Sequence, residues 1–289
     1  MQNSGSSGVT LSTLRELQEK YGVSASKALG QNFLVDPNMP KKIAALIKPE
    51  ESVLEVGPGV GSLTVALAKS AKKVVAIEYD KHILDPLQDV LNQFNVSDRV
   101  HVINEDVMTV DLEKICSENN INTIAGNLPY NISAPLLANI ARFVPSAKFV
   151  VAMVQKEVGD RFCAKQKTRE VSAVTLKTQL FMEVNSEFKV ARQSFVPQPR
   201  VDSVIITMKR RSNLALDIES SDIEPLFSLI DTGFSQRRKM MRQSLKSLLG
   251  EKISDIFTYA GLDSTLRPEQ CDLNDFAKLL KSWKVLNGN

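Results

Sequence analysis

Histidine is scarce in this chain of 289 residues, which contains only His82 and His101. A Ser-His-Asp triad or a histidine-rich metal cluster is therefore hard to assemble from it. The three cysteines, Cys116, Cys163 and Cys271, are odd in number, far apart and without C-x-x-C spacing. This usage argues against a disulfide framework or a zinc site and favours a reducing cytoplasm. We expect a cytoplasmic protein with no bound metal.

Long apolar runs are also missing, because no stretch approaches the roughly 18 apolar residues of a membrane helix. No membrane partner is therefore expected. The segment Asn3–Gly8 is small and polar and lacks the apolar centre of a signal peptide. Residues 1–9 are expected to be a disordered tail or a cloning remnant. Charge is nearly balanced, with 36 Lys and Arg against 33 Asp and Glu, so the total alone does not indicate nucleic-acid binding.

Short apolar strands alternate with helices through the N-terminal part of the chain. Strands are expected at 52–56, 73–77, 99–103, 122–126 and 148–154. Helices are expected at about 11–21, 36–47, 61–70, 81–94, 134–143, 156–164 and 170–182, with a polar loop at 28–34. This alternation predicts an α/β fold, with a parallel sheet that is covered by helices on both faces.

The rhythm changes after residue 185. Two strands within 186–211 flank the turn Phe195-Val-Pro-Gln-Pro199, and without a crossover helix they would add to the sheet edge in antiparallel fashion. Beyond residue 221 the pattern is helical only, with helices expected at 225–232, 238–249, 252–260 and 273–286. We therefore expect an α/β domain over residues 10–210 and a small all-helical domain over 211–289.

Glycines follow the first strand of the α/β domain, in Glu55-Val-Gly57-Pro-Gly59-Val-Gly61. Glycine lets the chain turn tightly and lets a ligand lie against the backbone, and the next helix adds its positive end. The dinucleotide fingerprint G-x-G-x-x-G would need glycine or alanine at Ser62. The spacing E-x-G-x-G-x-G favours S-adenosylmethionine instead, with a dinucleotide site or a structural turn as alternatives.

Carboxylates end the second and third strands. Glu78 lies 21 residues after Gly57, where it can accept both hydroxyl groups of a ribose. Asp106 can accept a hydrogen bond from the amino group of a cofactor adenine. The alternatives are a solvated strand-end acid for Glu78 and a helix cap for Asp106. All three loops follow strand C-termini, where open α/β sheets bind ligands.

The turn Asn127-Leu128-Pro129-Tyr130 follows the fourth strand and suits transfer of a methyl group to an adenine amino nitrogen. That nitrogen is a poor nucleophile because its lone pair is delocalised into the ring, so two acceptors on its N–H groups help more than a base. The Asn127 side-chain oxygen and the carbonyl of Leu128 or Pro129 can supply them, held ready by proline. An ordinary strand-to-helix turn is the alternative.

Aromatic side chains are expected to hold the target base. Tyr130 offers a flat face for a base taken out of its stack. Phe195 is a candidate for closing over the other face, and a core position is its alternative.

The sequence closely resembles the family of ribosomal RNA small-subunit adenine N6,N6-dimethyltransferases, which dimethylate two adjacent adenines near the 3′ end of small-subunit rRNA. The matching segments are Leu29-Gly-Gln-Asn-Phe-Leu34, Glu55–Gly61, Ile77-Glu78, Glu105-Asp106, Gly126-Asn-Leu-Pro-Tyr-Asn-Ile-Ser133, Gln155-Lys-Glu157, Phe195-Val-Pro-Gln-Pro-Arg-Val-Asp-Ser203 and Phe234-Ser-Gln-Arg-Arg-Lys239. The resemblance implies a Rossmann-like, seven-stranded class I methyltransferase sheet over 10–210, and S-adenosylmethionine as cofactor. The residues it implies at the cofactor are Asn32, Leu34, Gly57, Gly59, Glu78, Asp106 and Asn127.

Two basic clusters are candidates for RNA contact. Residues 188–211 carry six basic side chains against Asp202, and 235–246 carry five and no acid. Such clusters suit a phosphate backbone, although a single cluster is more often a solvated surface. The candidates are Arg200, Arg237, Arg238, Lys239 and Arg242.

The resemblance makes rRNA of the small ribosomal subunit, or of its precursor particle, the expected partner. A large-subunit rRNA adenine N6-methylase is one alternative, and a factor acting chiefly in ribosome assembly is another. A DNA adenine methylase usually has two prolines where this chain has Leu128-Pro129. The chain gives no sign of an oligomer, so a monomer is expected by default.

Overall fold

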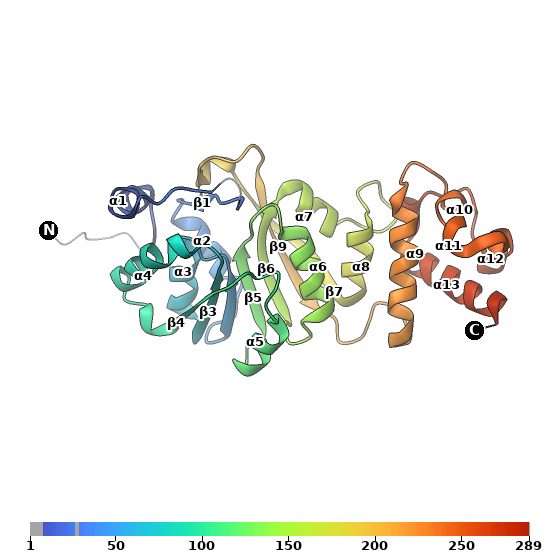
Figure 1. The fold of residues 1–289 in the computed structure, drawn as a ribbon, viewed down its shortest axis with the longest axis horizontal. Coiled ribbons are helices and arrows are strands. Elements are labelled where there is room, and N and C mark those ends of the chain that lie inside the picture. The colour runs from blue at the N-terminus through green and yellow to red at the C-terminus, as the bar shows by residue number, and fades with distance from the viewer. Residues whose placement is uncertain (1–7, 27–28, 289) are drawn as a thin grey trace. The chain divides into compact units, whose positions relative to one another are not determined.

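The computed structural model describes residues 8–26 and 29–288 (Figure 1). The chain divides into two compact units. The first contains the residues up to Gly159 together with Asn185–Arg210, and the second contains Asp160–Val184 and the residues from Arg211 onward. Most of the expected N-terminal tail lies outside the described residues. Val9, however, is 1% exposed and belongs to the core, so packing begins before residue 10.

The first unit is built on a seven-stranded sheet (Figure 1). Its strands, in spatial order, are β4 (Val100–Asn104), β3 (Lys73–Glu78), β2 (Ser52–Val56), β5 (Thr123–Asn127), β6 (Phe149–Gln155), β9 (Ser203–Arg210) and β7 (Met182–Val190). The first five are parallel, and β9 pairs with β6 in antiparallel fashion. The predicted parallel sheet and its antiparallel edge addition are confirmed.

The helices of this unit follow the strands as expected. They are α1 (Leu11–Tyr21), α2 (Asn38–Ala44), α3 (Ser62–Ser70), α4 (Leu84–Gln93), α5 (Leu112–Glu118), α6 (Ser133–Phe143) and the start of α7 (Lys156–Phe162). In α4, for example, Leu87, Val90 and Leu91 recur at helical spacing and are fully buried, so one apolar face packs against the core. The short helix α5 was not predicted.

A second sheet of two strands was also not predicted. β1 (Phe33–Leu34) pairs antiparallel with β8 (Phe195–Val196), within segments that the sequence indicates as a polar loop and a turn. Two residues are too few to show an alternating pattern, so the pairing is visible only in three dimensions. It joins the N-terminal loop to the segment that precedes β9.

The second unit is helical. It contains α8 (Ala173–Phe181), α9 (Ile223–Ser235), α10 (Met241–Ser244), α11 (Lys246–Leu249), α12 (Ile253–Ala260) and α13 (Leu273–Asn287). The expected boundary at residue 210 leaves out residues 160–184, which belong here because Leu176 and Leu180 share a core with Leu226 and Ile230. The helix expected at 238–249 is two short helices.

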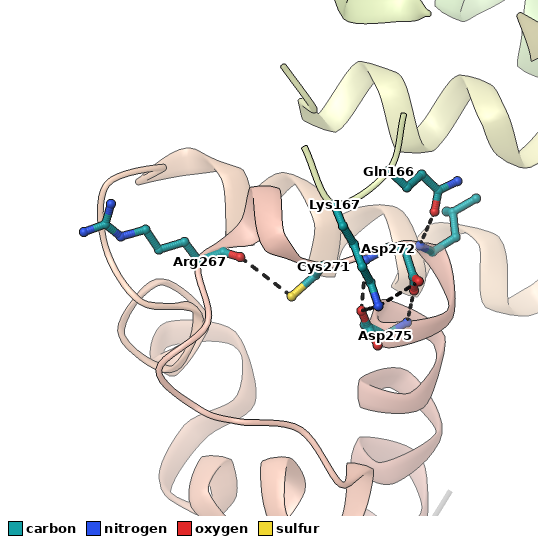
Figure 2. Close-up of polar contacts among 7 residues, drawn as sticks. Gln166, Lys167, Arg267, Cys271, Asp272 and Asp275 are labelled. Atoms are coloured by element: carbon teal, nitrogen blue, oxygen red, sulfur yellow. Dashed lines mark hydrogen bonds and ion pairs between the residues drawn. The ribbon is translucent and has the colours of Figure 1, made fainter. Parts of the chain in front are cut away.

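Polar contacts fix the loop that precedes α8 (Figure 2). Lys167 lies 3.0 Å from Asp272 and 3.1 Å from Asp275 at the start of α13, and these partners raise the pKa of its ammonium group. The Gln166 side chain accepts from the Leu273 amide. These contacts join segments that are about a hundred residues apart in sequence.

Candidate active site

A cavity of about 280 Å³ lies at the C-terminal ends of β2, β3 and β5 and is lined by residues 29–34, 55–60, 62–63, 77–79, 105–108 and 127–132. The structure brings ten of the expected site residues together here, because parallel strands present their carboxyl ends at one edge of the sheet. These pocket residues are Asn32, Leu34, Gly57, Gly59, Glu78, Asp106, Asn127, Leu128, Pro129 and Tyr130.

 Glu55, which opens the glycine motif but was not expected at the site, also lines the cavity.

The glycine motif forms the turn between β2 and α3. Gly57 and Gly61 have φ angles of +69° and +87°, a region that side-chain-bearing residues rarely adopt. A Cβ atom at Gly61 would also lie 3.0 Å from the Leu87 side chain. Ser62, the residue that departs from the dinucleotide fingerprint, donates to the Leu34 carbonyl at 2.6 Å. The motif therefore holds the N-terminal loop as well as shaping the cavity.

Glu78 is held by the backbone at both of its carboxylate oxygens. Oε2 accepts from the Gly59 amide at 3.1 Å, and Oε1 accepts from the Asp80 amide at 2.8 Å. The side chain is 6% exposed, and burial raises its pKa although the two amides lower it in part. Each oxygen keeps a lone pair for a further donor, so the carboxylate can receive two neighbouring hydroxyl groups without reorienting.

One carboxylate oxygen of Asp106 stabilises the turn that begins at this residue. Oδ1 accepts from the Met108 amide at 2.9 Å within a turn. The helix-cap alternative is wrong, because the next helix, α5, has Asp111 as its N-cap. The carboxylate lines the cavity, and its second oxygen remains available as an acceptor. The turn contact and ligand binding are therefore compatible.

Glu55 is a site feature whose buried state the sequence did not reveal. Its side chain is 1% exposed, and neither carboxylate oxygen has a hydrogen-bond partner among the described residues. Burial raises the pKa of this carboxyl group to about 8. The neighbouring Thr64 side chain lowers the pKa in part, and the negative charge of Glu78 raises it further. A buried carboxyl group that favours its neutral form therefore lines the cavity.

Hydrogen bonds to the backbone decide which acceptors the Asn127–Tyr130 turn presents. The side-chain nitrogen of Asn127, Nδ2, donates to the Asn32 backbone carbonyl at 3.1 Å. Because a carbonyl oxygen can only accept, the nitrogen must face it, which leaves the Asn127 Oδ1 atom as the free end. The amide of Leu128 donates to the Met153 carbonyl at 3.1 Å and fixes the next residue.

The two carbonyl groups of this turn differ. The Pro129 carbonyl accepts from the amides of Ile132 and Ser133 at 3.2 and 3.0 Å, so it is engaged in the start of α6. The Leu128 carbonyl accepts no backbone hydrogen bond from any residue that the structure describes. Of the two carbonyl groups considered from the sequence, the structure therefore leaves that of Leu128 open.

Tyr130 lines the cavity with a half-buried ring. Its hydroxyl group lies 2.9 Å from the Ser203 hydroxyl, in a hydrogen bond that either group can donate. Burial raises the pKa of the phenol, and the bond to Ser203 lowers it in part. The contact spans 73 residues of sequence, so sequence spacing gave no signal for it.

Phe195 is placed elsewhere. It is 2% exposed in the core, in β8 opposite Leu34 of β1, and is absent from the residues that line the cavity. In this arrangement the ring has no open face for a base, which fits the core position named as its alternative. A stacking role for Phe195 stays a prediction that requires β8 to move.

The basic candidates for RNA contact have exposed side chains, namely Arg200, Arg237, Arg238, Lys239 and Arg242. Arg237 also donates to the Arg169 carbonyl. Two members of the first cluster are engaged in the fold. Arg210 donates to four backbone carbonyls at the end of α6, and Arg211 binds the Gln179 carbonyl and Glu183.

A family model described as ribosomal RNA adenine dimethylase matches residues 22–284. The chain belongs to this family. It is 37% identical over 278 residues to ribosomal RNA small subunit methyltransferase A of Bacillus mycoides (strain KBAB4), covering 92% of this chain and 93% of the relative. The protein of the same name from Bacillus cereus (strain AH187) gives the same values.

Solved structures agree with the ribosomal RNA adenine dimethylase fold. A dimethyladenosine transferase from Plasmodium falciparum superposes with a TM-score of 0.70 at 27% identity, covering 88% of this chain and 98% of that one. The 23S rRNA methyltransferase ErmE superposes with a TM-score of 0.66 at 24% identity, covering 88% and 100%. Membership of the family confirms the expected class of enzyme, an rRNA adenine dimethyltransferase with a class I sheet, and implies a methyl donor.

Within the described residues, no helix combines the length and apolar character that crossing a bilayer requires. Over the same part of the chain, no three His, Cys, Asp or Glu side chains come together as a metal-binding group.

Proposed function

We propose that this enzyme transfers methyl groups from S-adenosylmethionine to the N6 amino groups of two adjacent adenines near the 3′ end of small-subunit rRNA. The reaction would belong to ribosome biogenesis in the cytoplasm. The relatives at 37% identity are named as small-subunit methyltransferases, which favours that substrate. The observation that carries the chemistry is the pair of open acceptors, Asn127 Oδ1 and the Leu128 carbonyl, beside the cavity.

The donors and acceptors around the cavity fit S-adenosylmethionine, which supplies an electrophilic methyl group when it is bound. Glu78 has one free lone pair on each oxygen for the ribose hydroxyls. Asp106 keeps one oxygen for an adenine amino group. The backbone at Gly57 and Gly59 has no side chains in the way of a ligand. Asn32 and Leu34 close the N-terminal side of the same cavity.

The residues of the turn would prepare the target nitrogen. Asn127 Oδ1 and the Leu128 carbonyl each accept one of its two N–H groups, which favours a pyramidal nitrogen with a localised lone pair. Both acceptors are fixed before the substrate binds. The Asn32 carbonyl holds the side-chain nitrogen of Asn127, and the Met153 carbonyl holds the backbone amide of Leu128. Such preorganisation lowers the barrier without a strong base. Tyr130 would stack against the base.

Exposed cations on each unit would contact the RNA backbone. Arg200 lies in the first unit, and Arg237, Arg238, Lys239 and Arg242 lie in the second. Arg238 also lines a second pocket with Arg169 and Arg267. Folded rRNA is recognised largely by shape and phosphate contacts, so separate basic surfaces suit this substrate better than a base-reading motif.

Methylation of separated ribosomal subunits tests the proposal. Small subunits lacking the modification and purified large subunits are incubated with the protein and radiolabelled S-adenosylmethionine. We expect label in the small-subunit rRNA alone. Label confined to the large subunit would replace the proposed substrate by the large-subunit rRNA. Binding to small subunits without any label would instead favour a role in assembly alone.

A further inference from the structure

The Tyr130 ring is anchored at its far end by a buried serine. The phenol oxygen lies 2.9 Å from Ser203 Oγ, and Ser203 is 0% exposed. Ser203 closes the segment Phe195–Ser203, which carries the family resemblance, but no role in the reaction follows from the sequence pattern.

Ser203 is itself held rigidly. It is the first residue of β9 and stands opposite Gln155 of β6 in the antiparallel ladder. The residue before it, Asp202, accepts the Lys156 amide at its carbonyl at 3.0 Å and the Arg192 amide at its carboxylate at 3.1 Å. The serine hydroxyl is therefore presented from a fixed backbone.

Strand β6, which pairs with β9 at Ser203, also fixes the backbone at the near end of Tyr130. β6 carries Met153, whose carbonyl accepts the Leu128 amide, two residues before Gln155, the partner of Ser203. The first turn of α6 begins with hydrogen bonds to the Pro129 carbonyl. One strand thus sets both the open acceptors of the turn and the anchor of the ring.

We propose that Ser203 is a positioning residue for methyl transfer, whose hydroxyl group fixes the far end of the Tyr130 ring against which the target adenine stacks. The inference rests on the proposed function. A ring held only at its Cβ atom swings about the Cα–Cβ bond, and a stacked base moves with it. The N6 atom then moves away from Asn127 Oδ1 and the Leu128 carbonyl. Displacements of about 1 Å can reduce rates by about a hundredfold.

The test is a double-mutant cycle on the full chain with undermethylated small subunits. Ser203→Ala and Tyr130→Phe each remove one end of the hydrogen bond while the ring stays in place. Each is expected to lower kcat about five- to tenfold, the worth of one such bond, with KM for the subunit and Kd for S-adenosylmethionine changed less than about twofold. The double variant should be no slower than either single variant.

Two further variants separate the hydrogen bond from packing. Ser203→Thr keeps a hydroxyl group and is expected to recover most of the activity. Ser203→Cys keeps the size of the side chain but is a weaker hydrogen-bond partner, so its kcat should stay well below that of the wild type. Full activity of Ser203→Cys would mean that the serine only fills space, and would overturn the proposal.

A spectroscopic readout tests the contact without catalysis. The chain has four tyrosines, so their ring carbons next to the hydroxyl give four NMR signals after selective ¹³C labelling. Tyr130→Phe identifies the signal of Tyr130. In Ser203→Ala this signal alone should shift, whereas unchanged signals would show that the hydrogen bond is absent in solution.

The outcomes distinguish the inference from the function on which it rests. If the wild type methylates small subunits but Ser203→Ala keeps its kcat, or the two single effects multiply in the double variant, Ser203 does not position Tyr130. If the wild type labels no small-subunit adenine, the proposed function fails, and a shift of the Tyr130 signal still establishes the anchor.

Discussion

Replacing Glu55 by glutamine should stabilise the first unit increasingly as the pH rises. The carboxyl group is 1% exposed, and burial raises its pKa from 4.5 to about 8. Between these two values the folded chain keeps a proton that the unfolded chain releases. The free energy of unfolding therefore falls as pH rises from about 4.5 to about 8. At about 1.4 kcal/mol per pH unit, the full loss has a ceiling of about 5 kcal/mol.

Glu55→Gln has nearly the same shape and no charge to develop, so it removes this loss. We expect little difference from the wild type at pH 5 and a gain of several kcal/mol at pH 8, below the ceiling of about 5 kcal/mol. Such a gain would be a large share of the about 5–15 kcal/mol by which domains are typically stable. Exposed Glu16 in α1 provides a control, since Glu16→Gln should not reproduce the pH-dependent gain.

Hydrogen exchange of the β2 and β3 amides, measured without cofactor from pH 5 to pH 8, follows the opening of the first unit separately from the second. The gain of Glu55→Gln should grow steadily across this interval. A gain that is the same at pH 5 and pH 8 would refute the reasoning, because it would mean that the folded protein carries the Glu55 charge throughout.

Gly126→Ala should nearly abolish methyl transfer, because a Cβ atom there would lie 2.7 Å from the Val56 carbonyl and 2.8 Å from the Leu128 side chain, directly before the turn. Single-turnover kinetics with saturating cofactor would measure the loss, and a variant with wild-type rates would show that the strand can shift without moving Asn127. Arg210→Ala should lower Tm by about 5–10 °C, a loss of about 2–3 kcal/mol, since it removes a donor from four carbonyls at and just after the end of α6. The carbonyls of Ile140 and Val144 keep a backbone amide, whereas those of Ala141 and Ala147 lose their side-chain donor. Calorimetry measures the change in Tm, and Arg210→Lys should recover only part of the loss. An unchanged Tm would contradict a stabilising role for the Arg210 hydrogen bonds.

The sheet and the position of the cavity were predictable from local patterns. Apolar strands at regular intervals mark a parallel sheet, and Gly57, Glu78, Asp106 and Asn127 all follow strand ends. Because parallel strands end at one edge, residues far apart in sequence were expected to meet, and the structure brings them to one cavity.

Features that depend on contacts between distant segments were not predictable. The hydrogen bonds from Ser62 to Leu34 and between Tyr130 and Ser203 follow no sequence period. The burial of Phe195 depends on a ladder of only two residues with β1. Likewise, the choice of the Leu128 carbonyl over that of Pro129 depends on how α6 begins.

Mass spectrometry of the 3′-terminal fragment of small-subunit rRNA tests whether Asn127 is required for dimethylation of the two adjacent adenines. Undermethylated small subunits are incubated with S-adenosylmethionine and either the wild type or Asn127→Ala, whose fold is checked by circular dichroism. We predict two adjacent N6,N6-dimethyladenines with the wild type and none with folded Asn127→Ala, because the amide held by Asn32 supplies one of the two acceptors. Normal dimethylation by Asn127→Ala, or methylation at another site by the wild type, would contradict the account.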